Sequence, residues 1–94
     1  MNRLVLSATL VERAALRYTP AGLAALDLSL KHESEVFEDG QPRKVSMEIK
    51  AVAIGAVTQG LLALELGRPG LFAGFVASSR NKRGVLFHIT AVEP

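Results

Sequence analysis

Three cations within four residues are the strongest chemical signal in the sequence. Arg80, Lys82 and Arg83 lie between two apolar runs of strand length, at residues 71–77 and 85–92. This pattern predicts a β-hairpin with a basic tip. Because like charges repel one another across a tight turn, the cluster favours a polyanionic partner such as a nucleic acid. The alternative interpretation is a solvated loop that is charged only for solubility.

The sequence shows no pattern that is typical of an enzyme. Two pairs of acidic residues are close in sequence, Glu33 with Glu35 and Glu38 with Asp39. The two imidazoles are those of His32 and His88. There is no cysteine, which excludes a thiol nucleophile and a thiolate metal site. The serines lack a nucleophile-elbow context, and the glycines occur singly rather than in a phosphate-binding loop. We therefore expect no catalysis, no metal and no cofactor.

Composition and charge bound the class of protein. The 94 residues, of which 49% are hydrophobic, predict one globular domain over residues 1–94. The net charge is only +2, but no acidic residue occurs between Glu65 and Glu93, where Arg68 joins the basic tip. This distribution predicts that one end of the molecule is locally positive.

We expect a cytoplasmic protein with no membrane segment. The first residues pass directly into strand-like sequence, with no apolar run typical of a signal peptide. The longest apolar stretch, residues 51–66, is short and interrupted by polar side chains. The lack of cysteine is compatible with a reducing compartment.

The candidate functional residues must be positioned by short strands. Alternating or apolar patterns predict strands at residues 2–11, 23–34, 43–51, 71–77 and 85–92, with a Pro-x-Gly turn in 12–22, a polar loop at 35–42 and one helix within 53–66. In the second strand Leu26, Leu28 and Leu30 face inward. In the third, Val45, Met47, Ile49 and Ala51 are expected on the core side.

Five strands with one short helix between the third and the fourth are typical of the OB-fold, a small all-β barrel. An SH3-like barrel and a small open sandwich are alternatives with the same pattern of elements. In the OB-fold, the second and third strands cross a groove that the connecting loops overhang.

The predicted groove has a polar, mostly cationic lining. Its outer face would carry the alternating polar residues of the second and third strands, Lys31, Lys44, Ser46 and Lys50, with Arg43 at the edge and Arg17 and Tyr18 on the first loop. Such a channel can follow the phosphates of a single strand while bases stack on aromatic rings. Tyr18 and Phe37 are the candidates for stacking, because the phenylalanines at residues 72, 75 and 87 fall in apolar strands. Glu33 and Glu48 would oppose a polyanion.

The sequence resembles the single-stranded DNA-binding proteins of bacteria, and most closely their primosomal members. The resemblance is carried by residues 2–7, residues 16–22, the positions of Leu30, His32 and Ser34, and the run Gly74-Phe75-Val76 that precedes a basic loop ending in Gly84, together with Gly55 and Gly67. It covers nearly the whole chain.

The resemblance implies an OB-fold homodimer without catalytic activity that binds single-stranded DNA during the restart of stalled replication forks. It further implies that the dimer bridges the helicase PriA to the loading protein DnaT. The family's DNA-contacting cations fall on Arg17, Arg43, Arg80 and Lys82. Two positions depart from the family, because Ser46 replaces a base-stacking tryptophan and Glu33 replaces a basic residue. We therefore expect modest affinity that falls steeply with salt.

Two other functions use the same fold. In a protein-interaction adaptor, the basic loop would dock onto an acidic partner and contact with DNA would be incidental. An oligosaccharide binder is a more distant alternative, since such sites favour aromatic and amide side chains over clustered Lys and Arg.

Overall fold

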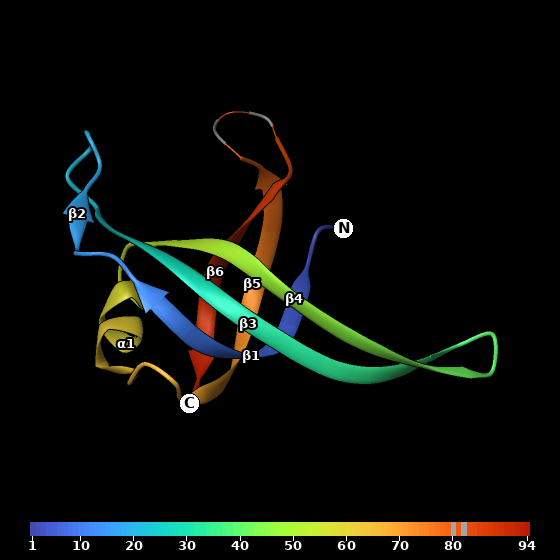
Figure 1. The fold of residues 1–94 in the computed structure, drawn as a ribbon. Coiled ribbons are helices and arrows are strands. Elements are labelled where there is room, and N and C mark those ends of the chain that lie inside the picture. The colour runs from blue at the N-terminus through green and yellow to red at the C-terminus, as the bar shows by residue number, and fades with distance from the viewer. Residues whose placement is uncertain (80, 82) are drawn as a thin grey trace.

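The computed structural model describes residues 1–79, 81 and 83–94 and shows a β-barrel with one helix (Figure 1). The elements are β1 (Leu4–Arg13), β2 (Arg17–Tyr18), β3 (Ala24–Glu38), β4 (Gln41–Ile54), α1 (Val57–Ala63), β5 (Pro69–Ser78) and β6 (Val85–Glu93). Strands are neighbours in the order β1-β5-β6-β4-β3-β2, and pairing of β1 with β3 closes the barrel. The β4–β6 pair is parallel and the others are antiparallel.

The core is formed by the inward residues of the alternating strands. Leu26, Leu28 and Leu30 are buried, as their spacing predicts, and they pack with Phe72 and Phe87. Helix α1 covers one end of the barrel, and buried Leu61 of the helix and Leu64 just after it join the same cluster. Burial of each such side chain stabilises the fold by ~1.5 to 3 kcal/mol, so the barrel is the stable part of the molecule.

The predicted OB-fold is confirmed. Five barrel strands are present among the described residues, with the helix between the third and the fourth of them. Because the two-residue strand β2 pairs only with the start of β3 and adds one to the numbering, this position lies between β4 and β5.

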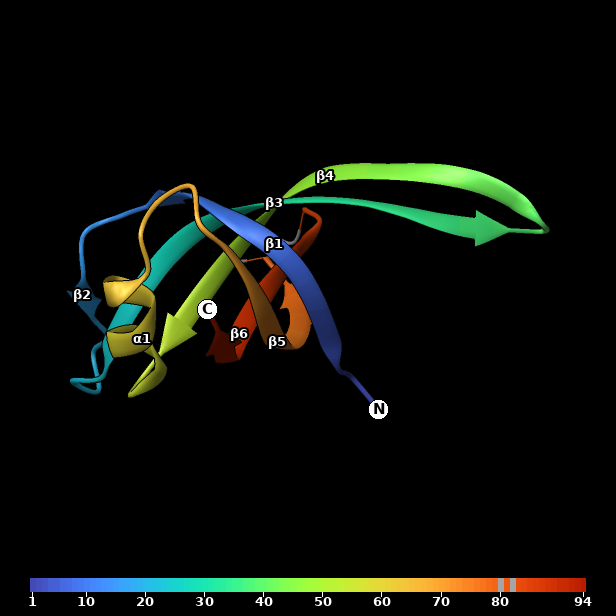
Figure 2. The same cartoon turned by 90° about the horizontal axis from the view of Figure 1, so that it is seen from below.

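The loop predicted at residues 35–42 is wrong, because β3 and β4 continue through it as a long hairpin. The two strands stay paired as far as Glu38 and Gln41, and only Asp39 and Gly40 form the turn. Both turn residues have positive φ, at 51° and 74°, which is the conformation of a type I′ turn and suits an Asp-Gly sequence. Residues 33–46 of this hairpin project beyond the barrel as an arm (Figures 1 and 2).

The helix lies within the predicted residues 53–66 but occupies only part of them, because Ala53 and Ile54 still pair with β3 as the end of β4. Its C-terminal carbonyl groups at Leu61 and Leu64 accept hydrogen bonds from the Arg13 guanidinium, which fixes β1 against the helix end. Met47, expected in the core, is 37% exposed because it lies at the base of the arm rather than inside the barrel.

Candidate nucleic-acid interface

The register of β3 and β4 brings the predicted groove residues onto one face of the sheet. Residues that are directly opposite one another share a face, and the outward pairs are Ser29 with Lys50, Lys31 with Glu48, Glu33 with Ser46 and Glu35 with Lys44. We call these eight residues the outer face. Lys31, Lys44 and Ser46 therefore lie together, as the alternation predicts.

Most lysines of the outer face stand opposite a carboxylate. Lys31 faces Glu48 and Lys44 faces Glu35, while Lys50 Nζ donates a hydrogen bond to Ser29 Oγ at 2.8 Å. Directly opposed charges of opposite sign attract each other across strands, by amounts of ~0.2 to 1 kcal/mol. The outer face consequently carries three cations and three carboxylates, and it is charge-balanced rather than strongly positive.

At the barrel end of this face, Arg17 is held by Asp27. Arg17 Nε lies 2.8 Å from Asp27 Oδ2 and Arg17 Nη2 lies 3.1 Å from Oδ1, so the contact is bidentate. The hydrogen bond and the charge of Asp27 raise the pKa of the Arg17 guanidinium above its ordinary value. The adjacent Tyr18 is 67% exposed, so its ring is free to meet a base. The pair fixes where Arg17 presents its remaining N–H donors.

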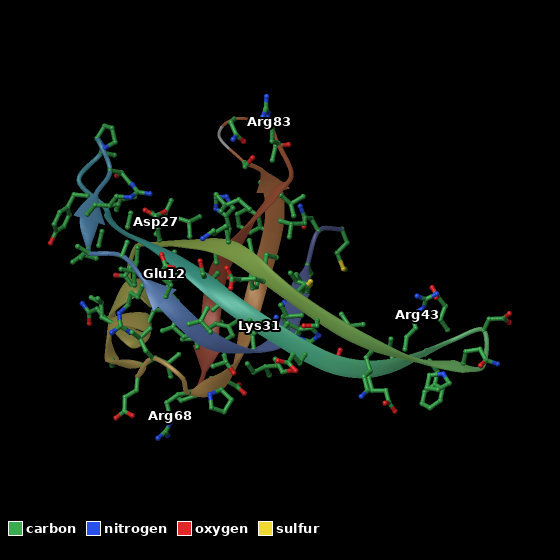
Figure 3. All side chains as sticks on the ribbon, viewed as in Figure 1. Glu12, Asp27, Lys31, Arg43, Arg68 and Arg83 are labelled. Carbon is green, nitrogen blue, oxygen red and sulfur yellow. The ribbon has the colours of Figure 1, made fainter. Side chains whose placement is uncertain are left out.

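Arg43 lies on the opposite side of the arm, not at the edge of the outer face. It stands opposite Val36, one residue out of phase with Lys44, and its Nε is 2.6 Å from Glu38 Oε1. Figure 3 shows Arg43 far along the arm, well away from Lys31. The period of two along a strand is the reason: neighbouring residues point to opposite faces.

The connection between β5 and β6 carries the basic tip. Of its three cations, Arg80 and Lys82 lie outside the described residues, and Arg83 is exposed. The Arg83 backbone is held locally, because its N–H donates to Asn81 Oδ1 at 3.0 Å and its carbonyl accepts from Ser79 Oγ at 2.7 Å. These hydrogen bonds link Ser79, Asn81 and Arg83, while the Arg83 side chain points outward (Figure 3).

Arg68 does not lie at the end of the molecule that carries the basic tip, as its place in the sequence predicted. Arg68 precedes β5 and Arg83 follows its far end, so the ten-residue strand separates them by ~30 Å (Figure 3). The two arginines were expected together because they are close in sequence. An extended strand, however, carries its two ends to opposite sides of the barrel.

The two histidines, the remaining candidates for chemistry, make contacts within the fold. His32 is buried, and its Nδ1 donates to the Ser7 carbonyl at 2.6 Å while Nε2 lies 2.8 Å from Ser34 Oγ. It thus connects β1 with the base of the arm. Phe75, expected in the core, is instead 38% exposed and stacks on His88 with ring centroids 4.6 Å apart.

Two negative observations apply to residues 1–79, 81 and 83–94. In that part of the chain, no three His, Asp or Glu side chains gather in a way that could hold a metal ion. No helix there has the length and the apolar character needed to cross a membrane.

Sequence reasoning missed the opposition of charges on the outer face, although a signal was available. If Asp39 and Gly40 are taken as a two-residue turn, each step back along β3 matches one step forward along β4. That count alone places Glu35 opposite Lys44 and Lys31 opposite Glu48.

Comparison with known proteins identifies the family. Residues 2–91 match a family model described as another single-strand binding protein family. The replication restart protein PriB of Bordetella pertussis is 50% identical over 81 residues, which are 86% of this chain and 76% of that protein. The chain belongs to the PriB family.

Solved structures agree with this assignment. PriB from Ralstonia solanacearum superimposes with a TM-score of 0.90 at 35% identity, covering 99% of this chain and 96% of that one. The single-stranded DNA-binding protein from Thermus aquaticus has a TM-score of 0.76 at 29% identity, covering all of this chain and 50% of that one. The PriB barrel and the larger DNA-binding protein therefore share one architecture.

Proposed function

We propose that the chain binds single-stranded DNA as an accessory protein of replication restart, with no catalytic role. The observation that carries this proposal is the outer face of β3 and β4 on a closed OB barrel, with Arg17 and Tyr18 of β2 paired to the start of β3. Two relatives, a replication restart protein and a single-stranded DNA-binding protein, support the same activity.

The charges suggest how the strand would be held. Phosphates would meet the basic tip first, because its cations have no carboxylate in the adjacent sequence. Across the outer face they would have to compete with Glu35 and Glu48 for the lysines. Affinity should therefore be modest and mainly electrostatic, with each phosphate neutralised adding ~0.7 to the magnitude of the logarithmic salt slope.

The direct test is a fluorescence-anisotropy titration of a labelled oligonucleotide at low and moderate salt. We expect tighter binding to the single strand than to a duplex, because a narrow face flanked by loops admits a flexible chain more readily than a rigid rod. Binding to duplex that is equal or tighter would overturn the proposal.

We further propose that the protein acts as a homodimer. Residues 4–8 of β1 pair with β5 on one edge, and within the described residues no strand pairs with their other edge. On the arm and at its base, the face that continues the barrel interior exposes Val36 and Met47, with Val45 half-buried between them. A second copy would pair the open edge and cover these apolar side chains.

Light scattering at micromolar concentration tests the dimer. The expected mass is about twice the 10.0 kDa of the chain. A matched pair of variants sharpens the result: Met47→Glu should shift the protein towards monomer, whereas Leu66→Glu, at an exposed residue beyond the helix, should not. A monomer throughout the accessible concentration range would contradict the proposal.

The cellular setting of the proposed activity is the cytoplasm, where the dimer would bridge the helicase PriA and the loading protein DnaT. This part rests on the family to which the chain belongs. A pull-down with purified PriA and DnaT, in the presence and absence of oligonucleotide, tests it. Failure of both partners to bind would remove the bridging role and leave DNA binding standing.

The charge-balanced outer face favours one alternative function, a protein-interaction adaptor. In that case the basic tip would dock onto an acidic protein segment, and oligonucleotide would bind weakly and without preference for the single strand. The anisotropy titration distinguishes the two functions.

A further inference from the structure

The arm leaves the barrel at His32. Main-chain pairing of β1 with β3 ends at Thr9 and Lys31, and His32 is the last buried residue along β3. Beyond it, among the described residues, residues 33–38 pair only with β4. The direction of the arm is therefore decided at the point where the backbones of β1 and β3 separate.

The imidazole of His32 spans the gap that opens there. Its Nδ1 donates a hydrogen bond to the carbonyl of Ser7 in β1 at 2.6 Å, and its Nε2 lies 2.8 Å from Oγ of Ser34 at the base of the arm. Because a carbonyl oxygen can only accept, Nδ1 carries a proton, and the Ser34 hydroxyl donates to Nε2 of the neutral ring. Within the described chain, no other side-chain hydrogen bond or ion pair joins the arm to the barrel. We call Ser7, His32 and Ser34 the histidine bridge.

We propose that His32 is a positioning residue that holds the arm in a fixed direction, so that the arm and barrel parts of the outer face form one continuous surface for a single strand. This inference rests on the proposed function. Lys31 lies on the barrel part of the outer face, Lys44 lies on the arm part, and the histidine bridge lies between them on the opposite side of the sheet. A strand that contacts both lysines requires a constant distance between them.

A small change in the direction of the arm would alter that distance. Lys44 stands opposite Glu35, which is three residues beyond His32 and therefore ~10 Å away at ~3.3 Å per residue, and the turn at Asp39 lies at ~23 Å. A rotation of about 20°, comparable to the twist between neighbouring strands, would move Lys44 by ~3 to 4 Å and the turn by ~8 Å. Either displacement breaks a hydrogen bond to a phosphate, so an arm that is free to rotate must be ordered again each time DNA binds.

Affinity measurements test the effect on binding. His32→Leu keeps an apolar side chain in the buried position and removes both hydrogen bonds, and we expect it to weaken binding of a ~20-nucleotide strand by about 2- to 10-fold. In His32→Asn the amide Nδ2 takes the place of Nδ1 and can still donate to Ser7, so part of the lost affinity should return. The matched control is His88→Leu, which makes the same change at a histidine that stacks on Phe75 of β5, and it should leave affinity unchanged. No weakening by His32→Leu, or equal weakening by His32→Leu and His32→Asn, would overturn the inference.

Residual dipolar couplings measure the direction of the arm without DNA. In the natural chain, we expect the amides of the arm and of the barrel to fit one alignment tensor. In His32→Leu the couplings of the arm should decrease while those of the barrel stay unchanged, which a general loss of stability would not produce. Ser34→Ala removes only the second hydrogen bond and should give a smaller decrease, so it keeps the test decisive if His32→Leu does not fold. Unchanged arm couplings in the folded variants would overturn the inference.

The imidazole nitrogens give an independent readout. Long-range proton–nitrogen NMR spectra of the natural chain should show the His32 proton on Nδ1, and a proton on Nε2 alone would overturn the histidine bridge. If His32→Leu loosens the arm but binds DNA as the natural chain does, the positioning role fails while DNA binding stands. If the natural chain does not bind single strands, the proposed function fails, whereas the couplings and the tautomer still decide whether His32 holds the arm.

Discussion

Removing one carboxylate from the outer face should strengthen binding to single-stranded DNA. Glu48 stands directly opposite Lys31, and both side chains face outward from the barrel part of the sheet. In Glu48→Gln the face gains one net positive charge, and Lys31 loses the carboxylate that competes with phosphate. The shape of the side chain is nearly unchanged, so the folded barrel should be retained.

The size of the effect follows from the exposure of the pair. Glu48 is an exposed residue, and exposed ion pairs contribute little because water and salt screen them. Affinity at low salt should therefore rise by only about 1.5- to 5-fold. If Lys31 then neutralises one more phosphate, the logarithmic salt slope should become steeper by ~0.7.

Anisotropy titrations at four or five salt concentrations measure both quantities. Glu65→Gln is the matched control, because it makes the same charge change beyond helix α1, at an exposed residue away from the outer face. Equal strengthening by the two variants would mean that overall charge, not the local pair, controls binding. No strengthening by Glu48→Gln would mean that DNA does not cross this face, and thermal unfolding checks that both variants are folded.

Three further variants test base stacking on the outer face, the role of the basic tip and the turn of the arm. Ser46→Trp should tighten binding by about 5- to 100-fold with little change in salt slope, since an exposed ring on the outer face can stack a base; unchanged affinity in anisotropy titrations would contradict this. Replacing Arg80, Lys82 and Arg83 together by Ala should weaken binding and flatten the salt slope without changing the melting temperature, and an unchanged affinity would mean that the tip is only solvated. Gly40→Ala forces a positive φ on a residue with a side chain and should cost the arm ~1 kcal/mol or more; hydrogen exchange should become faster in the arm amides only, and slower or unchanged exchange would argue against the turn.

The barrel could be predicted from the sequence because its strands have one buried face. Leu26, Leu28 and Leu30 alternate with polar residues, and that period of two identifies both the strand and its inward side. The helix was placed correctly between two strands, but its first residue could not be predicted, because Ala53 and Ile54 are apolar and fit either element. The hydrophobic pattern therefore predicts where strands and helices lie, but it predicts their first and last residues poorly.

The arm could not be predicted by the same means. The end of the arm, residues 35–42, lies outside the barrel core on both faces, so residues such as Glu35 and Glu38 show no apolar period and resemble a loop. Arg43 was placed at the edge of the outer face because it begins the predicted third strand, although the period of two points its side chain away from Lys44.

NMR titration of the isotopically labelled protein shows whether single-stranded DNA lies across the outer face of β3 and β4. With a ~20-nucleotide strand, we expect chemical-shift changes to concentrate at outward residues such as Lys31, Ser46 and Phe37, and in the connection at residues 79–84. Amides of helix α1 should change little. Changes confined to α1, or to the exposed apolar side of β1 and β5 around Val5 and Leu71, would contradict the claim.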